Sequence, residues 1–518
     1  MKFVEKIRML SHIVGFLLVV LITPVDAFGA TVFYLDPDVS GGTHNGTQAN
    51  PFNTLNGSPW TAINNALATG DVTIFCSARN ASADTNQVWS QTIDLVNKTS
   101  NPAGTLTIDG KSFWNSNDTT PNWAAYTGTS RCNLRGQIAN QNGVKRSKVT
   151  IDGIVFVQLG GNQGITICGD NWIIQNSDIS AAATVSGGPL VLVGPTADAA
   201  HEGADPTCPA SSNITIQDNV IHDSFNELIY VGGAGCLSSA VDADRFALRT
   251  NNGACHGVPS HNNITIQRNM LFNCGSRAAQ GDCIDMKAGL TNVTISQNDI
   301  TGNRNDNNSR CIVTQGITMD GTNQNYLIER NKIHDCLGVD DAAIAIVQDW
   351  GTPNGIIIRN NIIANVTVGE CIRIYDTQAA GVQIYNNTIS GCQSVAIVAF
   401  SGTVTVQNNA LLNNNGSGAQ TTMSGTITSD HNAFSATWGG TCSACISGLT
   451  SAAFTNVGTL NFSLPASSVL VDRGATIASF SEDYQNTRRP QGVAWDVGAF
   501  EFTTGAQIPS PPQNPRLQ

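Results

Sequence analysis

The sequence predicts an all-β protein: a single-stranded right-handed parallel β-helix (a solenoid) with a short capping helix near its N-terminus. An eight-residue pattern, apolar-x-apolar-x-x-Asn-x-apolar, recurs along the chain. There are 50 glycines and only 12% of residues are charged, which favours short strands joined by tight turns. No long stretch is rich in the Leu, Glu, Lys and Ala that build long helices.

The repeated pattern alternates apolar and polar residues, so one face of each strand is buried. A single coil cannot bury that face alone, whereas stacked coils can. Asn tolerates left-handed backbone angles and hydrogen-bonds at turns, so we expect stacked Asn side chains to mark one corner of every coil. The interval between the first two repeats allows one coil with a long loop, or two coils. The predicted column comprises Asn219, Asn269, Asn298, Asn331, Asn361, Asn387, Asn409 and Asn432.

A second strand follows in each coil, and its positions align between coils. The inward residues are predicted to be Ile229, Ile284, Ile312, Ile344, Ile372 and Ile397. The first outward column is then Tyr230, Asp285, Val313, Ala345, Arg373 and Val398. The second outward column is Gly232, Lys287, Gln315, Val347, Tyr375 and Phe400. We expect these two columns to form a surface that meets a ligand or a covering loop.

Residues 1–27 have the organisation of an export signal. Lys2, Lys6 and Arg8 precede an apolar centre at 13–22, and residues 25–27 (Val-Asp-Ala) form a plausible cleavage site. The apolar centre is shorter than the roughly 20 residues of a membrane span. We therefore expect a secreted, extracellular or cell-surface protein with no membrane span in the mature chain.

The remaining chain divides into four parts by pattern. Residues 28–110 are expected to form an N-terminal cap and the first coils, with a helix at 58–67 that begins with Ser-Pro. Residues 111–435 are expected to form the β-helix itself. Residues 436–503 are expected to form a C-terminal cap, with a last set of strands within 469–502, and residues 504–518 a Pro-rich tail.

Charge and cysteine content restrict the partners. The formal net charge is -12 and no sizeable Lys/Arg cluster is present, so no nucleic-acid partner is expected. We expect a monomer. Cys442 and Cys445 are the best local disulfide candidates among 14 cysteines. Cys283 and Cys311 share a column, which permits a disulfide between coils, whereas Cys274, Cys336 and Cys392 are interpreted as small, partly buried stacking residues.

The two ends of the chain resemble known families. Tyr34-Leu-Asp-Pro-Asp and Pro51-Phe-Asn-Thr-Leu resemble the opening of secreted right-handed β-helix proteins of the pectate-lyase-like superfamily, and the repeats resemble its parallel β-helix repeats. Asp472-Arg-Gly, Arg488-Arg-Pro and Asp496-Val-Gly-Ala-Phe-Glu-Phe resemble the C-terminal segment called choice-of-anchor Q in bacterial surface proteins.

The resemblance implies a polysaccharide lyase that cleaves an acidic, uronate-containing chain by β-elimination. In such lyases a Lys or Arg takes the C5 proton, and calcium or a basic residue neutralises the adjacent carboxylate. The stretch 281–287 (Gly-Asp-Cys-Ile-Asp-Met-Lys) fits these needs best, because it places Asp285 and Lys287 on one outward face. The residues expected to act are Lys287, Arg310 and Arg373 in catalysis, Tyr230, Gln315 and Tyr375 in substrate binding, and Glu227, Asp282 and Asp285 as ligands of Ca²⁺.

Two other functions remain open. A non-catalytic surface protein could use the same outward columns to bind a polysaccharide or a surface glycan. A pectin-hydrolase-like glycosidase is a second alternative, since residues 281–287 resemble the Gly-Asp-Asp-Cys-Ile-Ala-Ile-Lys stretch of those enzymes. One Asp of the pair is missing here, and no Gly-His-Gly follows on the next coil.

Two recurring features are interpreted as structural. His222-Asp223 and His334-Asp335 occupy the same repeat position, which indicates a turn, with His334 as an alternative acid–base group. Asn213-Ile-Thr, Asn263-Ile-Thr and Asn292-Val-Thr match the glycosylation sequon, but they also lie where the repeat enters its strand.

Overall fold

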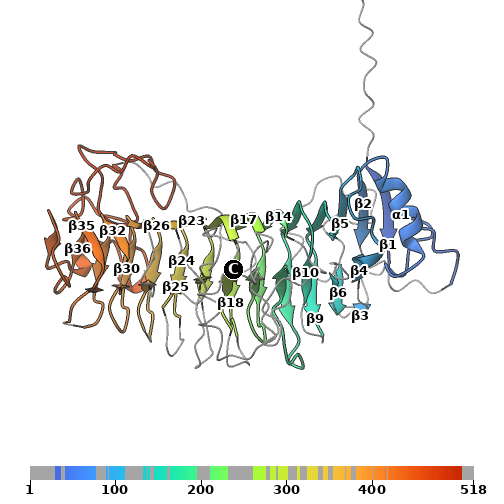
Figure 1. The fold of residues 1–518 in the computed structure, drawn as a ribbon, viewed down its shortest axis with the longest axis horizontal. Coiled ribbons are helices and arrows are strands. Elements are labelled where there is room, and N and C mark those ends of the chain that lie inside the picture. Colours follow the sequence, from blue (N-terminus) through green and yellow to red (C-terminus); the bar gives the residue numbers. More distant parts are fainter. Residues whose placement is uncertain are drawn as a thin grey trace, which may run out of the picture.

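The chain forms a long solenoid of short parallel strands in the computed structural model (Figure 1). The structure describes residues 30–36, 41–76, 89–90, 93–110, 132–136, 138–139, 145–159, 164–194, 210–231, 261–275, 281–286, 290–301, 312–315, 324–336, 342–347, 354–367, 369–374, 381–400, 402–416 and 418–504. The predicted export signal and the Pro-rich tail after residue 504 lie outside these residues.

Three parallel sheets run along the solenoid, and each complete coil contributes one strand to each. Sheet A contains β1 (Thr31–Leu35), β2 (Val72–Cys76), β5 (Leu106–Asp109), β8 (Val149–Asp152), β11 (Trp172–Gln175), β14 (Ser212–Gln217), β17 (His261–Gln267), β20 (Leu290–Ser296), β23 (Gln324–Glu329), β26 (Asn354–Arg359), β29 (Val382–Tyr385), β32 (Thr403–Gln407) and β35 (Thr426–Asp430).

Sheet B follows sheet A in each coil, across a sharp corner. It contains β3 (Trp89–Ser90), β6 (Asn133–Gly136), β9 (Val155–Gln158), β12 (Asp178–Ala181), β15 (Val220–His222), β18 (Met270–Phe272), β21 (Asp299–Thr301), β24 (Lys332–His334), β27 (Ile362–Ala364), β30 (Thr388–Ser390), β33 (Ala410–Leu412), β36 (Ala433–Phe434) and β37 (Ile446–Ser447).

Sheet C completes the coil. It contains β4 (Ile93–Asp94), β7 (Ile138–Ala139), β10 (Ile165–Ile167), β13 (Val191–Val193), β16 (Ile229–Val231), β19 (Ile284–Met286), β22 (Ile312–Gln315), β25 (Ile344–Val347), β28 (Ile372–Ile374), β31 (Ile397–Ala399) and β34 (Thr421–Met423).

The predicted register is confirmed in sheet C. Ile229 pairs with Ile284, which pairs with Ile312, and the same column continues to Ile344 and beyond. The side chains of Ile229, Ile284 and Ile344 point into one continuous core that runs along the solenoid. The interval between the first two repeats, from Asn219 to Asn269, corresponds to a single coil, because β14 pairs directly with β17.

The predicted Asn column is confirmed as a buried hydrogen-bonded ladder. Asn219 donates its backbone N–H and its side-chain amide to Oδ1 of Asn269, and Asn269 does the same to Asn298. The left-handed residues, however, are those just before the ladder, such as Asp218 (φ 56°) and Arg268 (φ 53°). The expectation that the ladder Asn takes this conformation itself was wrong. The preceding residue makes the turn, which leaves the Asn side chain directed inward.

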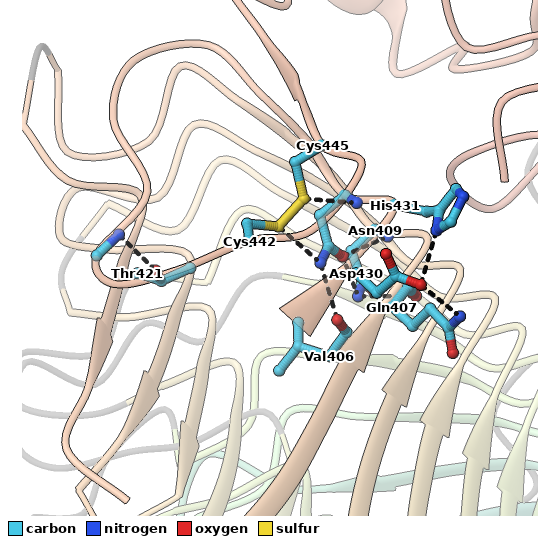
Figure 2. Close-up of a disulfide and its surroundings, with 10 residues drawn as sticks. Val406, Gln407, Asn409, Thr421, Asp430, His431, Cys442 and Cys445 are labelled. Carbon is cyan, nitrogen blue, oxygen red and sulfur yellow. Dashed lines mark hydrogen bonds and ion pairs between the residues drawn. A yellow bond between two sulfur atoms is a disulfide. The ribbon is translucent and has the colours of Figure 1, made fainter. Parts of the chain in front are cut away.

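The ladder ends at a disulfide (Figure 2). Asn409 donates to Oδ1 of Asn432 in the regular way. No further Asn follows, and Asn432 instead donates its backbone N–H to Sγ of Cys445 (3.2 Å) and its amide to Sγ of Cys442 (3.6 Å). The predicted Cys442–Cys445 disulfide is therefore confirmed, and it satisfies the last donors of the repeat.

Two interpretations of the cysteines were wrong. Cys283 is bonded to Cys274 of its own coil rather than to Cys311, and Cys392 is bonded to Cys371 of the preceding coil. Burial of a small residue at a repeat position does not show which second thiol comes within bonding distance, because the loops between strands decide this. A further disulfide joins Cys76 to Cys132.

The N-terminal end is closed by α1 (Pro59–Leu67), which confirms the predicted helix. Proline occupies its first turn, where no backbone N–H donor is required. Trp60, Ile63 and Leu67 are buried against the first coils. The helix covers the apolar end that the first coil would otherwise expose.

The C-terminal segment (residues 449–502) folds back along the solenoid, as the red trace in Figure 1 shows. Within 469–502 it contains no strand, so the prediction of a last strand set was wrong. Side chains such as Leu470 and Phe500 pack on the outer face of sheet B, where Ile362, Leu412 and Ala433 point outward. The segment therefore packs sideways on the coils by its apolar side chains, instead of extending their ladders.

Polar contacts fix this segment at the corner between sheets A and B. Asn386 donates to the carbonyls of Asp496 and Gly498, and Asn408 donates to that of Ala475. Arg489 is fully buried and pairs with the equally buried Glu501 at 2.8 Å. The left-handed corner residues thus provide the docking site, since they point away from the core.

Candidate functional site

The residues predicted to act belong to the outer side of sheet C. Asp285 lies opposite Tyr230 on one neighbouring coil and Val313 on the other, as the sequence pattern predicts. Arg373 occupies the same column on β28. Three coil steps separate Asp285 from Arg373, which corresponds to about 14 Å at the usual spacing of parallel strands. Asp285 and Arg373 are therefore aligned in one row but are not in contact.

The outward face of sheet C is enclosed at the coils of β16 and β19. Tyr230 and Glu227 are each 7% exposed, and Asp285 is 2% exposed. The inward neighbours Ile229 and Ile284 are fully buried as well, so sheet C is shielded on both faces at these coils. The burial of Tyr230 and Asp285 agrees with a covered face, which is one of the two possibilities that the pattern left open. Residue alternation determines the side to which a side chain points, but it does not show what covers that side.

Several predicted residues lie outside the described part of the chain. They are Lys287, Arg310 and Tyr375, and for Gln315 only the backbone within β22 is described. Asp282, at the start of β19, is half-buried and lies one coil away from Glu227. Their roles stay predictions.

Arg373 is the predicted catalytic residue whose surroundings are visible. Its guanidinium lies 3.4 Å from the carboxylate of Glu370 and 5.7 Å from the ring centroid of Phe400. The Arg373 side chain is 15% exposed, and Phe400 is 42% exposed. The group combines a charged fork, a carboxylate and an accessible aromatic ring. A guanidinium can bind a carboxylate in bidentate fashion, and a ring can pack against the C–H face of a sugar.

Sequence reasoning underestimated the two histidines of sheet B. His222 contacts Asp223 through Nδ1 (2.7 Å) and Asp178 of the preceding coil through Nε2 (3.0 Å). His334 repeats the arrangement with Asp335 (2.7 Å) and Asp299 (2.9 Å). The turn interpretation agrees with the positive φ of both following Asp residues. The sequence signal was an Asp at the first position of the preceding sheet B strand, although only the folded coils show that this Asp reaches the imidazole.

Each carboxylate pair favours the protonated histidine. Burial opposes the charge and is the largest single influence on the pKa of His222, but Asp178 and Asp223 together outweigh it and raise that pKa. Asp299 and Asp335 raise the pKa of His334 in the same way, against burial and the nearby Lys332. We interpret both as imidazolium groups that join adjacent coils, since each has both ring nitrogens bound to carboxylates.

The predicted calcium ligands do not form a compact site by themselves. Within the described residues, no group of three or more His, Cys, Asp or Glu side chains is placed to share a metal ion. Glu227 and Asp285 are also both buried, as given above.

Comparison with known proteins agrees with the architecture. The family model described as right handed beta helix region matches residues 306–456. The solenoid is a right-handed parallel β-helix. No curated protein has a sequence that matches this chain. Among its described residues, no helix has the length and apolar character needed to cross a bilayer.

Several solved structures are similar to the chain at low sequence identity. The complex of XylC with xylose has 10% identity and a TM-score of 0.51, and covers 91% of this chain and 98% of the other. Pectate lyase Pel9A has 14% identity and a TM-score of 0.44, with 91% and 96% coverage. The Streptococcus pneumoniae surface protein and adhesin PfbA has 13% identity and a TM-score of 0.29, with 77% and 99% coverage. At such identities the likeness is one of fold.

Proposed function

We propose that this protein is a secreted carbohydrate-active β-helix protein that cleaves an acidic, uronate-containing polysaccharide by β-elimination. The observation that carries the proposal is the Arg373–Glu370–Phe400 group on the outer side of sheet C. The guanidinium of Arg373 can bind the carboxylate of an acidic sugar, and the exposed ring of Phe400 lies beside it. The structure of XylC with xylose supports a sugar ligand on this fold.

The proposed reaction assigns separate roles to the basic residues. Lys287 or Arg310, in its neutral form, takes up the C5 proton of the uronate. Arg373, in its charged form, binds the adjacent carboxylate and stabilises the developing negative charge. The C4–O bond then breaks, a C4=C5 double bond forms, and the departing oxygen takes up a proton. Glu370 holds the guanidinium of Arg373 in place, so that it is already oriented when the substrate arrives.

Absorbance of the unsaturated product tests this proposal directly. The full chain is incubated with pectate, alginate and glycosaminoglycans, with calcium and with a chelator. Arg373→Ala is expected to reduce turnover by about 10²-fold, as the loss of a charge-stabilising donor does in other enzymes. Arg268→Ala is the matched control, because Arg268 is paired with Asp218 on sheet A, away from the site. No product from the wild type, or full activity of both Arg373→Ala and Lys287→Ala, would refute the lyase assignment.

Glycan binding without turnover is the second candidate. It is favoured by the burial of Asp285 and Glu227, since shielded carboxylates cannot reach a polymer at the surface. Retention of a glycan without any product would support it. Release of reducing ends without an unsaturated product would instead indicate the pectin-hydrolase-like alternative.

A further inference from the structure

Sheet A carries a regular array of uncharged polar side chains that the proposed lyase site does not use. We define the polar grid as Asn213, Asn263 and Asn292 together with Thr215, Thr265 and Thr294. These are the three sequon-like stretches of the sequence, on β14, β17 and β20. Ile214, Ile264 and Val293 lie between them and point into the core, so the Asn and Thr face outward. In Figure 1, β14 and β17 lie on the upper edge of the solenoid.

The Asn members are held in fixed orientations. Asn263 donates to Oδ1 of Asn213 at 2.7 Å, and Asn213 donates to Asn171 of the preceding coil at 3.0 Å. Asn292 accepts from Asn325 at 3.1 Å and donates to Oδ1 of Asn262, the neighbour of Asn263, at 2.7 Å. A side-chain amide has two N–H groups and two acceptor positions, and these contacts use one N–H of each Asn and one acceptor position of Asn213 and of Asn292. The remaining groups are exposed and already oriented, so little side-chain entropy is lost when a ligand binds.

Backbone conformation explains the Asn column but not the Thr column. Asn213, Asn263 and Asn292 have φ between 55° and 58°, a region that Asn tolerates better than most residues. The Thr position, in contrast, is an ordinary extended one, which takes Ile173, Leu327 and Ile357 on other coils. Thr also occupies this column on β2, β5 and β8, so it is the combination of an exposed Asn and a Thr that distinguishes the three coils of the grid from the coils on either side.

The surroundings of the grid define its extent and its charge. On the neighbouring positions, Gln267 donates to Gln217 at 2.8 Å and continues the uncharged pattern. The guanidinium of Arg268 lies 2.8 Å from the carboxylate of Asp218, so these two charges neutralise each other. Beyond β20, Arg330 contacts Glu482 and Asn486 of the C-terminal segment, which limits the array on that side. The result is a flat neutral area on a chain with a net charge of -12.

We infer that the polar grid binds a neutral, repetitive polysaccharide that lies along the solenoid. Sugar hydroxyls both donate and accept hydrogen bonds, as do the amides and hydroxyls of the grid. The array repeats every coil, at about 4.8 Å, so a polymer can repeat the same contact along its length. The lack of charge in the grid disfavours a polyanion, and the lack of large apolar side chains disfavours a lipid surface. This inference is independent of the proposed lyase activity.

Sedimentation with insoluble glycans tests the inference on the full chain. The wild type is incubated with cellulose and with insoluble xylan, and soluble polygalacturonate is the anionic comparison. The triple variant Thr215→Val/Thr265→Val/Thr294→Val keeps the shape and strand preference of each residue but removes the hydroxyls. We expect the insoluble glycans to retain the wild type, with little dependence on salt concentration. Retention of the triple variant should be about tenfold weaker, because each hydroxyl contributes a modest hydrogen bond.

The same threonine column offers a matched control. Thr73, Thr107 and Thr150 occupy it on β2, β5 and β8, where Asp71, Thr105 and Lys148 replace the Asn column. The variant Thr73→Val/Thr107→Val/Thr150→Val should therefore bind like the wild type. If the first triple variant does not fold, Thr265→Lys introduces a charge at one half-exposed position and should also weaken retention.

Four outcomes would overturn the inference. They are no retention of the wild type on either neutral glycan, retention only through a polyanion, equal retention of both triple variants, and Asn-linked glycans on the grid in the secreted protein. Loss of turnover in Arg373→Ala with normal retention would leave the grid supported. Retention on neutral glycan with no turnover of any uronate polymer would refute the lyase proposal alone.

Discussion

Asn331 donates both its backbone N–H (2.9 Å) and its side-chain amide (3.0 Å) to one oxygen, Oδ1 of Asn361 on the next coil. The amide of Asn331 also donates to the carbonyl of Ile295, and its own Oδ1 accepts two bonds from Asn298. One buried side chain thus satisfies polar groups on three coils. The turn between sheets A and B can be short because these groups need no water.

Removal of one ladder side chain should destabilise the fold strongly. Asn331→Leu keeps a similar volume but leaves several buried groups without partners, so we expect a loss of about 3 kcal/mol in the free energy of unfolding. Asn325→Gly is the matched control, because Asn325 is an exposed ladder residue with φ 63°, which glycine also accepts. Asn325→Gly should lower the free energy of unfolding by less than about 1 kcal/mol. Denaturant unfolding measures both, and equal losses would contradict a special role for the buried ladder.

The disulfides should differ in their effect on stability. Cys76–Cys132 closes a separation of 56 residues, whereas Cys442–Cys445 closes a separation of three. Replacement of the first pair by Ser should lower the free energy of unfolding by about 4 kcal/mol, and replacement of the second by about 2 kcal/mol. Hydrogen exchange should further locate the second effect at Asn432, whose donors lose the sulfur atoms. The prediction fails if the short-loop variant is the less stable of the two.

Stability should decrease as the pH rises through the folded-state pKa values of His222 and His334. Both pKa values are raised above the ordinary value of 6.5, so the folded state holds these protons more tightly than the unfolded state. Their contribution is complete below about pH 6.5 and is lost at higher pH. The double variant His222→Gln/His334→Gln should have a flatter dependence above pH 6.5. Free energies of unfolding of the wild type and the double variant, measured at several pH values above 6.5, test this prediction. The same dependence on pH in both proteins would contradict the imidazolium interpretation.

Docking of the C-terminal segment should depend on its buried ion pair. Burial raises the pKa of Glu501 to about 7, although Arg489 beside it acts in the opposite direction. Arg489→Met removes the compensating charge and should destabilise the segment by about 3–5 kcal/mol. The double variant Arg489→Met/Glu501→Leu should regain most of this loss, because no buried charge remains. Limited proteolysis reports release of the segment, and identical cleavage of wild type and single variant would argue against the ion pair as its anchor.

Much of the solenoid could be predicted because its information is local and repeated. The alternation around Ile284 and its equivalents predicts which side chains face inward, and successive copies of the pattern predict the register. The capping helix at 59–67 was predictable for a similar reason, since the Ser-Pro start and the apolar spacing are contained in one short stretch. The Cys442–Cys445 bond was predictable because its two residues are close in sequence.

The candidate site was less predictable because burial of an outward column depends on distant parts of the chain. Asp285 points to the predicted side of sheet C, but only the assembled molecule shows that this side is covered there. The Cys274–Cys283 disulfide and the contact between Asp178 and His222 depend on distances across the folded coils. The connecting segments set these distances, and residue spacing in the sequence does not give them.

The sequence by itself determined the repeat, its inward faces and the Asn ladder, because period-two alternation and stacked amides are properties of each coil. Only the tertiary structure decided where the C-terminal segment docks, which carboxylates hold His222 and His334, and which outward columns stay accessible. These features depend on the relative positions of residues on different coils, and the lengths and paths of the connecting loops set those positions.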